Sequence, residues 1–262
     1  MSTETTQTTI RKKGELSAPL KTIIRGVYLV KLFLTSFVKS RKSQVLTILG
    51  LLPVVVMVAW GVPPPARFFF RDFMQTLYIS LLIPLSGLLL GTAALSDEIE
   101  SHTIVQLVTR PVRRIEILIW RYIATVIAGT IISIIVTSGF YISVVVSEEI
   151  PLELLTGFWV VCAVCNAVYC AIFMLLGIAL KRPLVWGVVI TLYEQLLGVV
   201  AIFFEGAVFS LSGHILNYGQ LFADYTYSIP NWPPALSGSV LAVLVILCIM
   251  LSAILFRGKD LA

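Results

Sequence analysis

Charged residues are scarce in this chain. Only 13% of its 262 residues are Asp, Glu, Lys or Arg and 58% are apolar, whereas a soluble domain is about one quarter charged. The mean hydropathy is +0.97. A single soluble core cannot bury so much apolar surface, so the composition excludes an ordinary soluble domain. It indicates a polytopic membrane protein.

Motifs for catalysis are also missing. The sequence has no Gly-x-x-x-x-Gly-Lys-Ser/Thr motif, so the chain does not bind ATP in the P-loop manner. It has no Gly-x-Ser-x-Gly nucleophile elbow. Its two histidines, His102 and His214, fall in connectors predicted to lie on opposite sides of the membrane, so they cannot share a metal site within one chain. We predict no catalytic residues and no metal or cofactor bound by this chain.

Cysteines are few, and all four lie inside apolar runs. Cys162 and Cys165 match a C-x-x-C pattern and would share one face of a helix. A redox or soft-metal role needs a further thiol or ligand in a loop, and no loop has one. We interpret the cysteines as small packing residues. An intramembrane thiol oxidoreductase built on this pair is the alternative.

Six apolar runs approach the length of about 20 residues that crosses a bilayer. They cover residues 44–62, 73–95, 119–146, 154–180, 184–205 and 236–256. The predicted fold is all-α, with six transmembrane helices in one domain over 44–262. Residues 1–19 are polar and predict a disordered tail. Residues 20–43 mix apolar and basic residues and predict an amphipathic helix at the membrane surface.

The distribution of positive charge predicts the orientation. Seventeen of the nineteen Lys and Arg residues precede the first run or lie in the 96–121 connector, at Lys181–Arg182, or in the C-terminal tail. Arg67 and Arg71 lie on the other side. The positive-inside rule then places both termini and the 96–121 connector in the cytoplasm.

The 96–121 connector is a charged segment between two apolar runs. Ser96 can cap a helix that has Asp97 and Glu98 in its first turn, and Pro111 would end that helix. We predict a short cytoplasmic helix over 97–108 that docks onto a partner. The charged residues of the connector are Asp97, Glu98, Glu100, Arg110, Arg113, Arg114, Glu116 and Arg121.

Of the polar residues inside predicted spans, we single out Glu194, Gln195 and Asn166, because polar groups are costly there. A charge near the bilayer centre costs about 2.5–3.5 kcal/mol on insertion scales. Glu194, with Gln195 beside it, either lines a polar pathway or holds helices together through a hydrogen-bonded carboxyl. Asn166 is interpreted as a hydrogen-bonding link between helices.

The connector 206–235 is the only long one on the predicted outer side, and it is rich in aromatic residues. Such rings favour the membrane–water boundary, so one interpretation is an interfacial anchor. The other is a pair of short helices that cap an outer exit.

Several motifs resemble those of one family. Residues 98–114, Glu-Ile-Glu-Ser-His-Thr-Ile-Val-Gln-Leu-Val-Thr-Arg-Pro-Val-Arg-Arg, resemble the cytoplasmic signature of type-2 ABC transporter permeases, Glu-x-Glu-Ser-Gly-Thr-Ile and then Arg-Pro-Val-x-Arg. The segment 20–43 is similar to the family's elbow helix. Residues 176–183 followed by Tyr193-Glu194, and residues 256–261, resemble its later motifs. His102 departs from the pattern, because the family usually has Gly there.

The resemblance implies a permease of an ATP-driven ABC exporter in the cell membrane of a prokaryote. Its partners would be a second permease, as homodimer or heterodimer, two copies of a separate ATPase that binds ATP and Mg, and membrane lipids, but no nucleic acid. The connector would be the coupling helix that seats in the ATPase. Its contact residues would be Asp97, Glu98, Glu100, Thr103, Leu107, Arg110, Pro111, Arg113 and Arg114. A membrane scaffold that recruits a cytoplasmic partner without transport is the alternative.

Overall fold

The computed structural model describes residues 26–35, 66–100, 114–146, 149–200, 209–223 and 232–258, with isolated positions between 45 and 59. The described residues form helices and short connecting turns, and none of them is in a β-strand. The all-α prediction is confirmed for this part of the chain. The predicted tail 1–19 and most of the predicted first span lie outside it.

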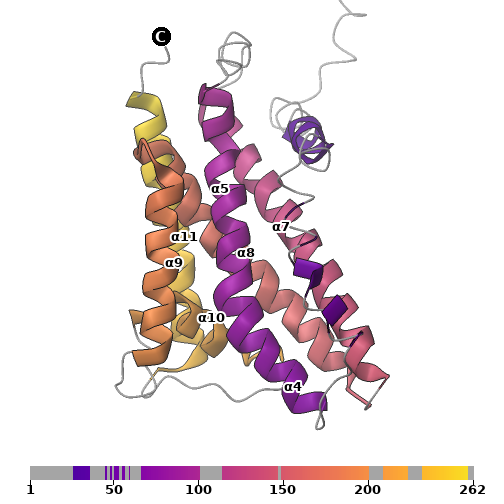
Figure 1. Cartoon of the computed structure of the whole chain (residues 1–262). Helices are drawn as coiled ribbons and strands as arrows, with labels where there is room; N and C mark the ends of the chain where they lie inside the picture. The colour runs from indigo at the N-terminus through magenta and orange to yellow at the C-terminus, as the bar shows by residue number, and fades with distance from the viewer. Residues whose placement is uncertain are drawn as a thin grey trace, which may run out of the picture.

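The helices form one bundle (Figure 1). A short helix, Gly26–Thr35, comes first. It is followed by α4 (Ala66–Asp72), the π-helix η1 (Phe73–Leu82), α5 (Ile83–Glu100), α7 (Arg114–Val145), α8 (Leu152–Ala179), α9 (Pro183–Val200), α10 (Leu211–Gly219) and α11 (Pro234–Gly258). α4, η1 and α5 are continuous, so the second apolar run belongs to a longer helical segment than the predicted 73–95.

Four segments are long and apolar enough to cross a membrane. They are Phe68–Thr92, Ile115–Val145, Leu152–Ala179 and Pro234–Gly258, which match the predicted second, third, fourth and sixth spans. The predicted fifth span, 184–205, corresponds to α9, where the apolar stretch Pro183–Leu197 is shorter.

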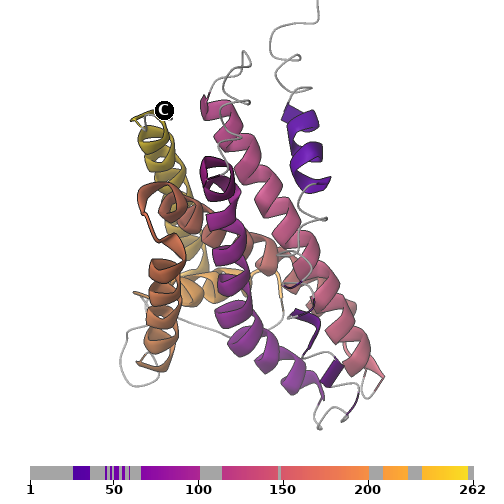
Figure 2. The ribbon, with the colours of Figure 1, turned by 45° about the horizontal axis from the view of Figure 1, so that its top comes forward.

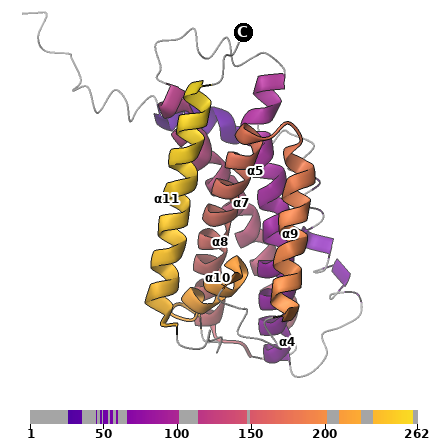
Figure 3. The ribbon, with the colours of Figure 1, turned by 90° about the vertical axis from the view of Figure 1, so that its left-hand side faces the viewer.

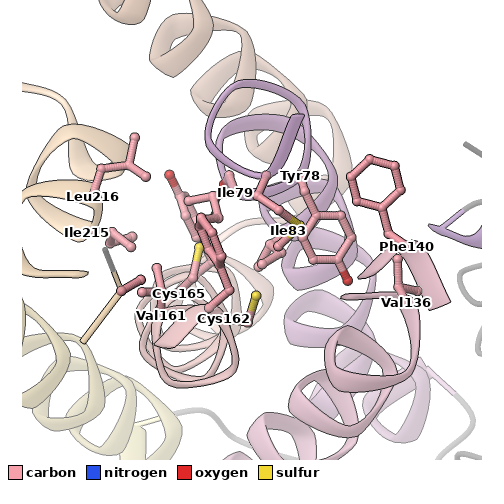
Figure 4. Close-up of a cluster of buried hydrophobic side chains, with 14 of the residues drawn as sticks. Tyr78, Ile79, Ile83, Val136, Phe140, Val161, Cys162, Cys165, Ile215 and Leu216 are labelled. Carbon is pink, nitrogen blue, oxygen red and sulfur yellow. Dashed lines mark hydrogen bonds between the residues drawn. The ribbon is translucent and has the colours of Figure 1, made fainter. Parts of the chain in front are cut away.

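α8 lies at the centre of the bundle, and α11 lies at its edge (Figure 3). About two thirds of the apolar window of α8 (67%) is buried, compared with 22% for α11. The buried cluster around α8 joins Val161, Cys162 and Cys165 to Tyr78 and Ile79 of η1 (Figure 4). Since α11 is apolar but mostly uncovered, its outer face suits contact with lipid.

Glycines allow α5 to lie close against α8. A Cβ atom at Gly87 would lie 2.9 Å from the Cβ of Tyr169, and one at Gly91 would lie 2.8 Å from the Cβ of Phe173. Residues 87–91 have the Gly-x-x-x-Gly spacing that places both glycines on one helix face. The packing of α5 on α8 therefore depends on shape at these two positions.

The helix ends sort into two groups. The C-terminal ends of α5 and α11, the start of α7 and the α8–α9 turn lie at one end of the bundle (Figures 1 and 3). α4 and α10 lie towards the opposite end (Figure 3). Lys181, Arg182 and Arg257 consequently share an end with the start and finish of the 96–121 connector, whereas Arg71 lies at the other.

The acidic part of α5 differs from the prediction. We expected Ser96 to cap a separate helix, with Asp97 and Glu98 in its first turn. α5 instead runs without interruption from Ile83 to Glu100, so Ser96 lies inside a helix. Extending an existing helix gains one hydrogen bond per residue, whereas starting a new one carries a nucleation cost. The predicted cap at Ser96 is wrong for this reason.

Candidate functional site

The predicted partner-binding connector is framed by two long helices. Asp97, Glu98 and Glu100 lie in the last described turn of α5, and Arg114 is the first residue of α7. Both helix ends lie at the same end of the bundle (Figure 1). His102 and the remaining predicted contact residues lie outside the described part of the chain; these are Thr103, Leu107, Arg110, Pro111 and Arg113. Their predicted roles stay predictions.

The helix Gly26–Thr35 packs on the first turns of α7, where the 96–121 connector ends (Figure 2). The guanidinium carbon of Arg121 lies 4.5 Å from the centre of the buried Phe33 ring. This cation–π geometry is favourable by about 0.5–1 kcal/mol when partly exposed. Gly26 lies against the indole ring of Trp120, where a Cβ atom would clash. The N-terminal helix is thereby attached to the last residues of the connector, at the start of α7.

Glu194 is buried, with 3% of its surface exposed, and its carboxylate meets the N-terminus of α10. The backbone N–H of Leu211 donates to Oε1 at 2.9 Å. Oε2 accepts from the Ser210 hydroxyl at 3.0 Å, and from the backbone N–H and hydroxyl of Ser212, both at 3.3 Å. The Ser210 hydroxyl also accepts from the N–H of Gly213 at 3.1 Å. Negative charge is favourable at this end of a helix, so Glu194 caps α10 from α9.

This contact draws α10 into the bundle. Glu194 lies six residues before the end of α9, or about 9 Å along the helix axis. α10 therefore starts beside α9 rather than beyond its end, and lies between α9 and α11 (Figure 3). Glu194 was predicted from the sequence as a functional or structural carboxyl, whereas Ser210 and Ser212 were not predicted to be its partners. A serine just before a short helical segment is a recognisable capping signal.

The far side of α10 is held by a second polar cluster. His214 Nδ1 and the Ser237 hydroxyl of α11 lie 3.1 Å apart, and Asn217 donates to that hydroxyl at 2.7 Å. Asn217 also donates to the carbonyl of Trp232 at 3.2 Å, and the His214 and Trp232 rings meet edge to face. Within the described residues the predicted outer connector holds one short helix; its Trp232 ring packs on His214, whereas Phe209 and Phe222 are exposed. The predicted second short helix falls where residues are not described.

Gln195, the neighbour of Glu194, contacts the second span. Its Nε2 donates to the backbone carbonyl of Ser80 in η1. The two adjacent residues thus bind different elements, since Glu194 holds α10 and Gln195 holds η1. Sequence separation concealed this pairing, because Ser80 and Gln195 are 115 residues apart.

Asn166 links α8 to α7. Its Nδ2 donates to the Ser133 hydroxyl at 2.9 Å and to the carbonyl of Cys162 at 2.8 Å. A pocket nearby is lined by the polar residues Tyr78, Ser86 and Ser133 together with apolar side chains. Sequence reasoning did not single out these hydroxyl groups.

The C-x-x-C cysteines point at different neighbours. Cys162 Sγ lies 3.8 Å from the Thr137 hydroxyl, and Cys165 Sγ donates to the carbonyl of Ile79 at 3.7 Å. Both thiols are free and fully buried. Among the described residues, no group of three or more His, Cys, Asp or Glu side chains could hold a metal ion. The contacts of the two thiols are those of packed, hydrogen-bonded residues.

The sequence matches the family described as ABC-2 family transporter protein over residues 30–261. Because this covers most of the chain, the protein belongs to the ABC-2 family of transporter membrane proteins. No curated protein matches it. Members of this family are typically non-catalytic, multi-pass membrane subunits that generally pair with an ABC ATPase.

Proposed function

We propose that this chain is the transmembrane subunit of an ATP-driven ABC exporter. It couples ATP hydrolysis by a separate ATPase subunit to export of a substrate across the cell membrane of a prokaryote. Family membership over residues 30–261 supports this proposal, as does the absence of a P-loop motif from the full sequence. ATP and Mg bind to the ATPase, of which the complex holds two copies.

The proposed topology has six spans. The run 44–62 and α9 add to the four long apolar helices. Both termini and the 96–121 connector face the cytoplasm. In support, Lys181, Arg182 and Arg257 lie at the connector end of the bundle, whereas Glu149, just before α8, and Glu153, in the first turn of α8, lie at the opposite end. A second permease, identical or different, completes the pathway.

The proposed ATPase contact is the segment between Glu100 and Arg114. The observation that supports this contact is that the segment is joined to a long helix at each end. α5 runs unbroken from Ile83 to Glu100, and α7 starts at Arg114. A segment fixed to two long helices can pass a push on to both of them. Thr103, Leu107 and Arg110 contact the ATPase, and the flanking charges and Pro111 hold the segment in place.

Co-purification tests this contact directly. The chain is expressed with its ABC ATPase, whose gene we expect to lie beside that of this chain, and the amount of ATPase recovered with the tagged permease is measured. Thr103→Asp, Leu107→Asp and Arg110→Asp are each expected to remove most of the ATPase. Leu152→Asp is the matched control, because Leu152 is exposed at the start of α8 at the opposite end.

Unchanged ATPase recovery in all three variants would contradict the proposed contact. The scaffold alternative needs a second measurement in vesicles that hold the purified complex. ATP-dependent substrate movement excludes a scaffold, whereas a bound ATPase without any movement favours one.

A further inference from the structure

Pro84 interrupts the hydrogen bonding of the second span. It lies at the second position of α5, directly after η1, inside a helical segment that continues from Ala66 to Glu100. Proline has no N–H, so the carbonyls four and five residues earlier, those of Ser80 and Ile79, lose a possible backbone donor. An unpaired carbonyl inside a membrane protein is costly, and another donor has to replace the missing one.

Two other helices supply donors to those same two carbonyls. Gln195 Nε2 of α9 donates to the Ser80 carbonyl, and Cys165 Sγ of α8 donates to the Ile79 carbonyl at 3.7 Å. Ile79 and Cys165 belong to one buried cluster (Figure 4). The gap that Pro84 leaves is thus filled from α8 and α9, and these side-chain bonds tie the second span to both helices.

The segment before Pro84 has an unusual helical form. η1 covers ten residues, and the N–H of Ile83 donates to the carbonyl of Tyr78, five residues back. The Ser80 hydroxyl donates to the carbonyl of Gln75, also five residues back, at 2.8 Å. Long π-helices are rare, and proline and π segments are both places where helices bend. Residues 73–84 are therefore the part of the second span where the helix can bend.

We propose that Pro84, Gln195 and Cys165 form a joint about which α5 moves relative to α4 and η1. The joint has two arrangements, one with the Ser80 carbonyl bound to Gln195 and one with it released. Glu194 lies beside Gln195 on α9 and binds the N-terminus of α10. Movement at the joint is therefore passed on through α9 to α10. Gln195 is a positioning residue. The link between movement at the joint and ATP hydrolysis rests on the proposed function.

Hydrogen exchange of the full chain in lipid nanodiscs tests the joint without any ATPase. Gln195→Leu removes the side-chain donor of the Ser80 carbonyl, so amides of residues 73–90 are expected to exchange about tenfold faster. Pro84→Ala restores an N–H four residues after Ser80, within reach of that carbonyl. Adding Gln195→Leu to Pro84→Ala is therefore expected to have little further effect.

Leu196→Ala is the control, because Leu196 is exposed on α9 and is expected to leave the exchange of residues 73–90 unchanged. If Gln195→Leu accelerates the exchange of residues 73–90 equally in the wild-type and the Pro84→Ala backgrounds, the proposed joint is overturned. Unchanged exchange in Gln195→Leu alone would overturn it as well.

The second experiment measures movement at the outer end in the complex with the ATPase. Spin labels at the exposed positions Leu221 and Leu236 report the distance between the turn after α10 and the start of α11. Wild type is expected to change this distance when ATP is added, and Gln195→Leu is expected to lose that change while it still hydrolyses ATP. A distance change that persists in Gln195→Leu would overturn the role of Gln195. If ATP changes nothing in wild type, the proposed function fails instead.

Discussion

The α5–α8 contact and the α9–α10 contact are held together in different ways. Gly87 and Gly91 let the backbones of α5 and α8 approach so closely that a single methyl group would not fit. α10 is held instead by the carboxylate of Glu194, which accepts backbone and hydroxyl hydrogen bonds. Lipid provides no hydrophobic force between helices, so close packing and hydrogen bonds are the means that remain.

The difference predicts which of the two contacts changes when the bundle moves. The close packing of α5 on α8 does not depend on a hydrogen bond that could change its partner. Separating the two helices would lose many van der Waals contacts at once. A contact made by a few hydrogen bonds can be released when another partner accepts or donates. We therefore expect α5 and α8 to move as one body and α10 to change position.

The largest effect is expected at the shape-dependent contact. Gly91→Leu places a side chain where a Cβ atom alone would lie 2.8 Å from Phe173 Cβ and 3.1 Å from the Cys170 carbonyl. We expect a loss of about 3 kcal/mol in stability, because backbone cannot move aside. Thermal unfolding in detergent measures it.

Gly258→Leu is the matched control for that variant. Among the described residues, nothing outside the adjacent backbone lies within 4 Å of a Cβ placed at Gly258, at the end of α11. Similar melting temperatures for the two variants would contradict a contact that depends on shape between α5 and α8.

A smaller and more local effect is expected at α10. Glu194→Ala removes the acceptor for the N–H groups of Leu211 and Ser212, which costs about 2 kcal/mol for buried groups. Hydrogen exchange of residues 211–219 is expected to accelerate while the α5–α8 contact keeps its protection. Glu194→Gln, which keeps one acceptor oxygen, should fall between wild type and Glu194→Ala. If α10 retains full protection in Glu194→Ala, the cap is not what holds it.

A modest effect is expected at the link between α7 and α8. Asn166→Ala removes the hydrogen bond to Ser133, and such bonds between membrane helices contribute about 0.6 kcal/mol on average. A double-mutant cycle with Ser133→Ala measures the coupling between the two side chains. A coupling near zero would show that the bond contributes nothing to packing.

The smallest effect is expected at the cysteine pair. Serine at positions 162 and 165 keeps a donor that can reach the Thr137 hydroxyl and the Ile79 carbonyl. The double variant is therefore expected to keep its stability and the ATP-dependent activity of the complex. Complete loss of activity in a stably folded double variant would support the thiol oxidoreductase alternative.

Apolar runs predicted where most helices lie, but their ends were less predictable. The second helical segment extends from Ala66 to Glu100, past both limits of the run 73–95. Residues such as Arg67, Asp72 and Glu100 lower the hydropathy without interrupting backbone hydrogen bonds, so the hydrophobic signal stops before the helix does. The predicted cap at Ser96 is wrong because the helix continues past the end of the apolar run, as far as Glu100.

The polar residues of the spans were predictable, but their partners were not. Glu194 stood out because charge is costly in a membrane. That it caps α10, and that Gln195 replaces a donor missing at Pro84, follows only from how α9 packs. Proline in an apolar run does signal a carbonyl in need of a donor, but the sequence does not say which helix supplies it.

Photo-crosslinking from position 107 is the most direct test of an ATPase contact at the connector. A photoreactive amino acid replaces Leu107, or Leu152 at the opposite end, and membranes that contain the permease and its ATPase are irradiated. A covalent adduct with the ATPase is predicted from position 107 and none from position 152. An adduct from position 152 without one from position 107 would contradict both the proposed orientation and the proposed contact.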